Sequence, residues 1–89
     1  LSLGSLDRRQ ALAQRFVRLS DLATDAKATI VRIDGGRGFV ARMSALGFTP
    51  GAEIAIRANP GHGPLIVRIM DTQIALGRGQ AAHVTVKPL

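Results

Sequence analysis

Residues 37–51 constrain the fold most, because they predict a short helix that ends abruptly and leads into a strand. Phe39, Met43 and Leu46 recur at spacings of four and three, which places them on one face of a helix. Gly47 follows at once and suits the left-handed backbone position at which many helices end. We therefore expect the helix to end at Gly47, with Met43 and Leu46 in the core.

The residues after Gly47 predict how the chain reverses. Phe48 is expected to fold back onto Met43, as the second residue beyond such a helix often does. Pro50 and Gly51 suit the two central positions of a type II turn, because proline fixes φ and glycine supplies a positive φ. Five residues thus form a predicted structural motif: Leu46, Gly47, Phe48, Pro50 and Gly51.

The rest of the chain is typical of short β-strands separated by turns. Strands are expected over residues 28–34, 53–58, 65–70 and 73–76, and a short last strand around residues 84–86. In the first strand Thr29, Val31 and Ile33 are expected to share a face, and Ile30 interrupts that alternation, which indicates either a bulge or burial of both faces. In the later strands the side chains expected in the core are Ile54, Ile56, Leu65, Val67, Ile69, Val84 and Val86.

These elements predict a mainly β fold with short helices, a small barrel of five strands with one helix between the first two. We expect the barrel domain to span residues 19–89, with a single helical turn at residues 19–22 plugging one end. Residues 1–18 are interpreted as an N-terminal extension, in which residues 6–17 have a thin apolar stripe and form at best a marginal helix.

The sequence offers no set of residues for catalysis, a cofactor or a metal. The absence of cysteine excludes disulfides and thiolate metal sites. His62 and His83 lie far apart, and neither Ser20 nor Ser44 has a spaced histidine and carboxylate. The glycine-rich residues 35–38 lack the motif of a phosphate-binding loop and are interpreted as a connector that needs positive φ. We therefore expect a protein that is not an enzyme, with no catalytic, cofactor or metal residues.

The charge of the chain favours an acidic partner. Twelve Lys and Arg face six Asp and Glu, which gives a net charge of +6. Because these charges are scattered, a basic solvated surface also accounts for them. Nucleic acid stays an alternative partner, although the chain has three Phe and no Trp or Tyr for stacking on bases. No apolar run approaches the ~20 residues of a membrane span.

Residues 42–51, Arg-Met-Ser-Ala-Leu-Gly-Phe-Thr-Pro-Gly, carry a resemblance to a known family. From Leu19 onward the chain resembles ferrous iron transport protein A, the FeoA family, in its opening turn, its first strand, this central motif and its closing pattern. Three departures from the family pattern affect turns only. The family commonly has Leu-Arg where Leu76-Gly77 stand, although Arg78 follows by one place. Thr24-Asp25 stand where the family often has Pro-Gly, and Asp tolerates left-handed backbone. The family also often has Gly near Asp71.

The resemblance implies an SH3-like barrel and a small cytoplasmic accessory protein, peripheral to the inner membrane. Its implied partner is a membrane ferrous iron permease with a GTP-binding domain, whose transport it supports without activity of its own. The family is also associated with transition metal ions. Two alternatives stay open: a basic barrel that binds nucleic acid, and a detached regulatory domain of a metal-dependent repressor. Weak self-association also stays open.

Two exposed segments are predicted to contact the partner. Arg37 and Arg42 lie on the outer side of the expected helix. The loop over residues 59–64 combines two prolines and two glycines around His62, so it is exposed and partly stiffened. Within it, Pro60, Gly61 and His62 are the candidate contact residues.

Overall fold

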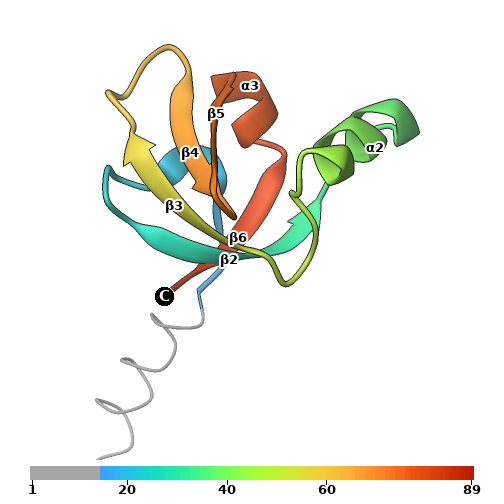
Figure 1. The fold of residues 1–89 in the computed structure, drawn as a ribbon, viewed down its shortest axis with the longest axis horizontal. Coiled ribbons are helices and arrows are strands. Elements are labelled where there is room, and N and C mark those ends of the chain that lie inside the picture. The colour runs from blue at the N-terminus through green and yellow to red at the C-terminus, as the bar shows by residue number, and fades with distance from the viewer. Residues whose placement is uncertain (1–14) are drawn as a thin grey trace, which may run out of the picture.

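The computed structural model describes residues 15–89, which form one antiparallel sheet curled around an apolar core (Figure 1). The strands are β1 (Val17–Arg18), β2 (Lys27–Ile33), β3 (Glu53–Ala58), β4 (Leu65–Ile69), β5 (Thr72–Leu76) and β6 (Val84–Pro88). They lie in the order β1-β6-β2-β3-β4-β5. The helical segments are η1 (Leu19–Asp21), α2 (Arg37–Ala45) and α3 (Arg78–Ala81). The mainly β fold, with its main helix between the first two long strands, is as predicted.

The sheet begins two residues before the predicted domain boundary. Val17 pairs with Val86, so β1 extends the sheet beside β6. The helix predicted over residues 6–17 lies mostly outside the described residues, and Val17 itself lies in a strand. The predicted turn at residues 19–22 is confirmed as η1, where Leu19 is fully buried and Leu22 donates its N–H to the Leu19 carbonyl.

The core is aliphatic, and all seven side chains predicted to enter it from the later strands are buried. They come from β3, β4 and β6. The register of β3 against β4 places Ile54 opposite Ile69 and Ile56 opposite Val67. Alternation of side chains along each strand puts every second residue on this inner face.

The predicted inner face of β2 is wrong. Ala28 and Ile30 are buried, whereas Thr29, Val31 and Ile33 are only partly buried. The register of β2 against β6 shifts between Ile30 and Arg32, so Val31 is the extra residue of a bulge. The bulge that the sequence indicated is therefore present, and it interrupts the strict alternation on which the predicted face rested.

The predicted ending of α2 is confirmed in its hydrogen bonds. Gly47 has φ of +100° and donates its N–H to the Ser44 carbonyl at 2.9 Å. Phe48 donates to the Met43 carbonyl at 2.9 Å and is fully buried. This pair of bonds is the Schellman arrangement. The following turn has Gly51 at φ of +93°, and the Ala52 N–H reaches the Thr49 carbonyl at 3.0 Å.

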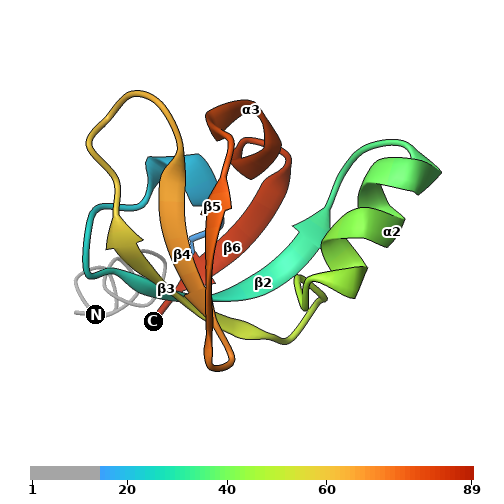
Figure 2. The ribbon, with the colours of Figure 1, turned by 45° about the horizontal axis from the view of Figure 1, so that its top comes forward.

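Leu46 does not enter the core, and this prediction is wrong. Its side chain is 46% exposed, whereas Met43 is 1% exposed. The helix stands at the side of the barrel (Figure 2), so only a narrow part of its surface meets the sheet. Because Gly47 reverses the chain, Phe48 is buried together with Met43, and the Leu46 side chain is left exposed at the C-terminal end of the helix.

Candidate functional site

The first candidate surface is the outer side of α2. Arg37 and Arg42 are both exposed, and within residues 15–89 neither forms an ion pair. Arg42 lies in the last turn, where a cation is favourable, but Arg37 is the first residue of the helix and no acidic residue accompanies it in the first turn. A cation at a helix N-terminus opposes the helix dipole, so the stability of the helix does not account for Arg37.

The second candidate surface is the loop between β3 and β4. Pro60, Gly61 and His62 are exposed, as predicted for a loop of this composition. Gly61 and Gly63 have φ of +93° and +68°, so the loop turns through glycine backbone at two points. Its tip therefore projects from the barrel with a defined backbone path.

The base of this loop is held by a polar network centred on Asn59. The Asn59 Nδ2 donates to the carbonyls of Ser20 at 3.2 Å and Leu22 at 2.6 Å. Its Oδ1 accepts from the Gly61 N–H at 3.1 Å and from Arg78 Nη2 at 2.7 Å. The bonds to Ser20, Leu22 and Arg78 are partly buried, and they tie the loop to the η1 turn and to α3, which fixes the loop relative to the barrel.

Sequence reasoning missed both Asn59 and Arg78. Asparagine before a Pro-Gly pair is a recognisable signal, because its side chain often accepts from the backbone two residues on. Arg78 carries no such signal. Its contact with Asn59 joins residues separated by 19 positions, which only the folded topology brings together.

The two candidate surfaces lie on opposite sides of the barrel. In both views α2 stands beyond one end of β2, whereas the β3–β4 loop lies at the other side, near η1 (Figures 1 and 2). The structure thus brings Pro60, Gly61 and His62 together, and it places Arg37 and Arg42 on one helix, but it does not join the two sets.

The two histidines lie in different environments. The ring of His83 meets the ring of Phe39 edge to face, with centroids 5.6 Å apart, so it packs against the first turn of α2. His62 lies exposed on the loop. Among residues 15–89 there is no cluster of three or more His, Cys, Asp or Glu side chains with the geometry to hold a metal ion.

None of the helices in this part of the chain is long and apolar enough to cross a bilayer.

The curled six-stranded sheet, with one helix at its side and short helical turns at its ends, defines a small SH3-like barrel domain. Comparison with known families gives a more particular answer. Residues 17–88 match the FeoA domain family, so the chain belongs to that family.

Known relatives agree with this assignment. The chain is 38% identical over 72 residues to the Fe(2+) transport protein A/Fe(2+) transporter FeoB fusion protein of Porphyromonas gingivalis, a match that covers 80% of this chain and only 8% of the fusion protein. A crystal structure of the iron uptake regulatory protein FeoA superposes with a TM-score of 0.81 at 32% identity, covering 84% of this chain and all of that one.

A second solved structure describes the fold in the same terms. Stenotrophomonas maltophilia FeoA, crystallised with zinc and described as a procaryotic SH3 domain protein, has a TM-score of 0.69 and 27% identity. The match covers 79% of this chain and 88% of that one. The SH3-like barrel expected from the resemblance is therefore confirmed.

Proposed function

We propose that this protein is an accessory protein of ferrous iron uptake. It binds the cytoplasmic GTP-binding part of a membrane ferrous iron permease and supports transport without catalysis. It works in the cytoplasm, at the inner membrane, where its partner holds it.

The observation that carries this proposal is the fusion protein of Porphyromonas gingivalis, which joins a related domain to an Fe(2+) transporter in one chain. A covalent link keeps two modules at high effective concentration, which is useful when the modules act in contact. When the two modules are separate chains, a binding surface between them must take the place of this covalent link.

The outer side of α2 is the stronger candidate for that surface. Arg37 opposes the dipole of its own helix, so its place there is better explained by a partner than by folding. The loop residues Pro60, Gly61 and His62 form the second proposed contact. Because the two surfaces lie on opposite sides, a partner that uses both must wrap around the barrel or hold it between two parts. The net charge of +6 speeds encounter with an acidic partner.

The test is a titration of the permease's cytoplasmic part with the full chain and three variants. The variants are Arg37→Ala/Arg42→Ala, a Gly-Ser replacement of residues 60–63, and their combination. Exposed charge contacts contribute ~0.2–1 kcal/mol each, so loss of the arginine pair should weaken binding roughly two- to thirtyfold. If the loop also contributes, the combined variant should lose the sum of the two free energies.

A matched control removes the same charge elsewhere. Arg15→Ala/Arg18→Ala changes two exposed arginines, the first just before β1 and the second within it. This double variant should leave the affinity within about twofold, apart from a small loss of electrostatic attraction during encounter. Arg37→Ala should not lower the melting temperature, because it removes a cation from the helix N-terminus. If neither the arginine pair nor the loop replacement weakens binding more than the control, these surfaces are not the contact.

A further inference from the structure

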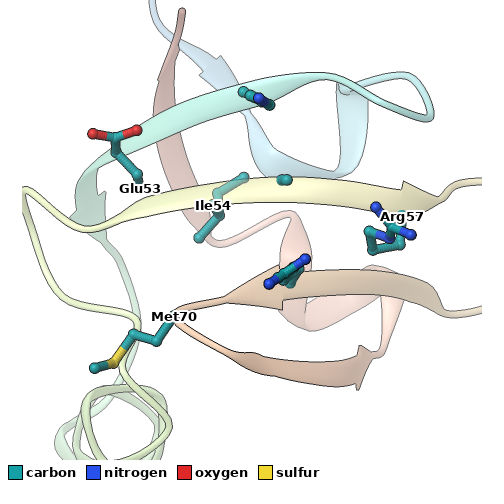
Figure 3. Close-up of a pocket in the computed structure, with 7 residues that line it drawn as sticks. Glu53, Ile54, Arg57 and Met70 are labelled. Atoms are coloured by element: carbon teal, nitrogen blue, oxygen red, sulfur yellow. The ribbon is translucent and has the colours of Figure 1, made fainter.

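A groove on the outer face of β2, β3 and β4 is not used by the proposed contacts. It has a volume of about 330 Å³ and is open to solvent along the sheet (Figure 3). Its lining includes three basic side chains from three adjacent strands: Lys27 on β2, Arg57 on β3 and Arg68 on β4. All three are exposed.

Strand register explains why the groove is hollow and why its charges converge. Ala55 pairs with Lys27 on one side and with Arg68 on the other, so a methyl group stands between two cations. Neighbouring strands lie ~4.8 Å apart, which leaves roughly 10 Å between the Cα atoms of Lys27 and Arg68. Arg57 follows Ala55 by two residues and lines the same groove. The three cations thus border a hollow whose floor is a small side chain.

The fold does not neutralise these charges. Within residues 15–89, Lys27 and Arg57 have no carboxylate within 4.0 Å. Arg68 reaches only Asp71, at 3.8 Å, and that aspartate is fully exposed. An anion placed over Ala55 lies between these cations and is attracted by each of them.

The other end of the groove has a different character. Glu53 and Met70 lie there, away from Arg57 (Figure 3). A carboxylate at this end disfavours a continuous polyanion such as a nucleic acid strand. Among the described residues that line the groove, none has an aromatic side chain on which bases would stack. The groove is therefore basic at one end and apolar and acidic at the other. This arrangement suits a peptide that has carboxylates at one end and an apolar residue at the other.

We propose that this groove binds a short acidic segment of a partner protein. Two or three carboxylates of the segment lie over Ala55, between Lys27, Arg57 and Arg68, and an apolar residue that follows them lies against Met70. The groove shares no lining residue with α2 or with the β3–β4 loop, although Met70 lies beside Gly47, the residue that ends α2. The proposal does not depend on iron transport being the function.

The test uses an acetylated Asp-Glu-Asp-Leu-Gly peptide, with Asn-Gln-Asn-Leu-Gly as its uncharged counterpart. The full chain, labelled with ¹⁵N, is titrated with each peptide and followed by amide chemical shifts. Saturable shifts should centre on residues 27–28, 55–57 and 68–70 with the acidic peptide, and the uncharged peptide should bind at least tenfold more weakly. No saturable shift with the acidic peptide, or shifts centred on α2, would overturn the proposal.

Two variants separate the groove from general attraction to a basic protein. Arg57→Glu and Ala55→Glu should each weaken peptide binding at least tenfold, the first by reversing a contact charge and the second by filling the hollow with a carboxylate. Arg18→Glu, the same reversal on β1, should change it less than twofold. Equal losses in Arg57→Glu and Arg18→Glu would mean that only net charge matters.

Two further probes test other anionic partners. A short oligo-dT strand and vesicles of phosphatidylglycerol with phosphatidylcholine are titrated in the same way. Both should bind weakly and without dependence on Arg57. If either binds more tightly than the acidic peptide and loses that affinity in Arg57→Glu, the groove is a nucleic acid or membrane site and the peptide proposal is wrong. A failure of permease binding would leave all these readouts unchanged, so the two proposals fail independently.

Discussion

At the scale of single residues, left-handed backbone marks where this chain must turn. Besides the glycines, two residues among those described have positive φ: Asp25 at 74° and Met70 at 55°. Asp25 confirms the expectation that aspartate tolerates this conformation in place of glycine. Met70 has no such tolerance, and it occupies the two-residue turn between β4 and β5, near the place where the family often has Gly.

Gly47→Val is expected to destabilise the fold by ~1–2 kcal/mol or more, because a β-branched residue is strained at φ of +100°. A Cβ at this position would meet Ile69 Cδ1 at 3.6 Å, an ordinary contact, so the loss should come from the backbone. Chemical denaturation measures it. The control is Gly38→Val, within α2 and with open space around it, which should be nearly neutral. Equal effects of the two substitutions would refute the account of the helix ending.

Met70→Asn is expected to stabilise the fold by roughly 0.5–1 kcal/mol, because asparagine accepts left-handed backbone more readily. Met70 is 80% exposed, so little apolar burial is lost. Thermal unfolding of the variant beside wild type measures the change. A fall in melting temperature would show that the methionine side chain contributes more to the fold than its exposure indicates.

At the scale of elements, the inner faces of β3 and β4 were predictable from local alternation, whereas the inner face of β2, which a bulge interrupts, and the buried face of the helix were not. The alternating residues of β3 and β4 face the core because every second side chain of a strand lies on one face. The helix differs because α2 has only nine residues and meets the sheet mainly at Met43. The apolar periodicity correctly predicted a helix here. Because the chain reverses in the Schellman ending, however, Phe48 packs into the core and Leu46 stays exposed.

Ile56→Ala and Ile69→Ala are each expected to cost ~2–5 kcal/mol, from lost burial and a residual cavity. Both side chains are at most 1% exposed and come from paired strands. Ile66→Ala is the control, since Ile66 lies on β4 but is only partly buried, and its loss should be clearly smaller. Urea denaturation ranks the three variants. If Ile66→Ala costs as much as the other two, the inner and outer faces of β4 are assigned incorrectly.

At the scale of the whole molecule, the barrel fold could be predicted from the sequence. Which residues meet on its surface could not, because that depends on how the strands are arranged in the sheet. Pattern and composition predict the fold because alternation and turn residues act locally. The link between Asn59 and Arg78, and the groove around Ala55, depend on which strands and turns lie side by side. For the same reason the sequence did not indicate that α2 and the β3–β4 loop face away from each other.

No tight ferrous site is expected in the isolated protein. His62 and His83 lie on different turns, and within residues 15–89 no carboxylate or imidazole cluster joins either of them. Calorimetry with ferrous or manganous ion should give weak heat without a defined stoichiometry. A one-to-one site of micromolar affinity that disappears on changing His62 or His83 to Ala would contradict this expectation.

The central claim is that this barrel binds a permease through charged surface contacts. The most direct measurement is a titration of the permease's cytoplasmic GTP-binding part with the wild-type full chain, at low salt and at roughly 0.5 M salt, where screening shortens the reach of surface charge. We predict saturable one-to-one binding that weakens severalfold at the higher salt. Absence of saturable binding at low salt would contradict the claim, and an affinity unchanged by salt would show that the charges take no part in it.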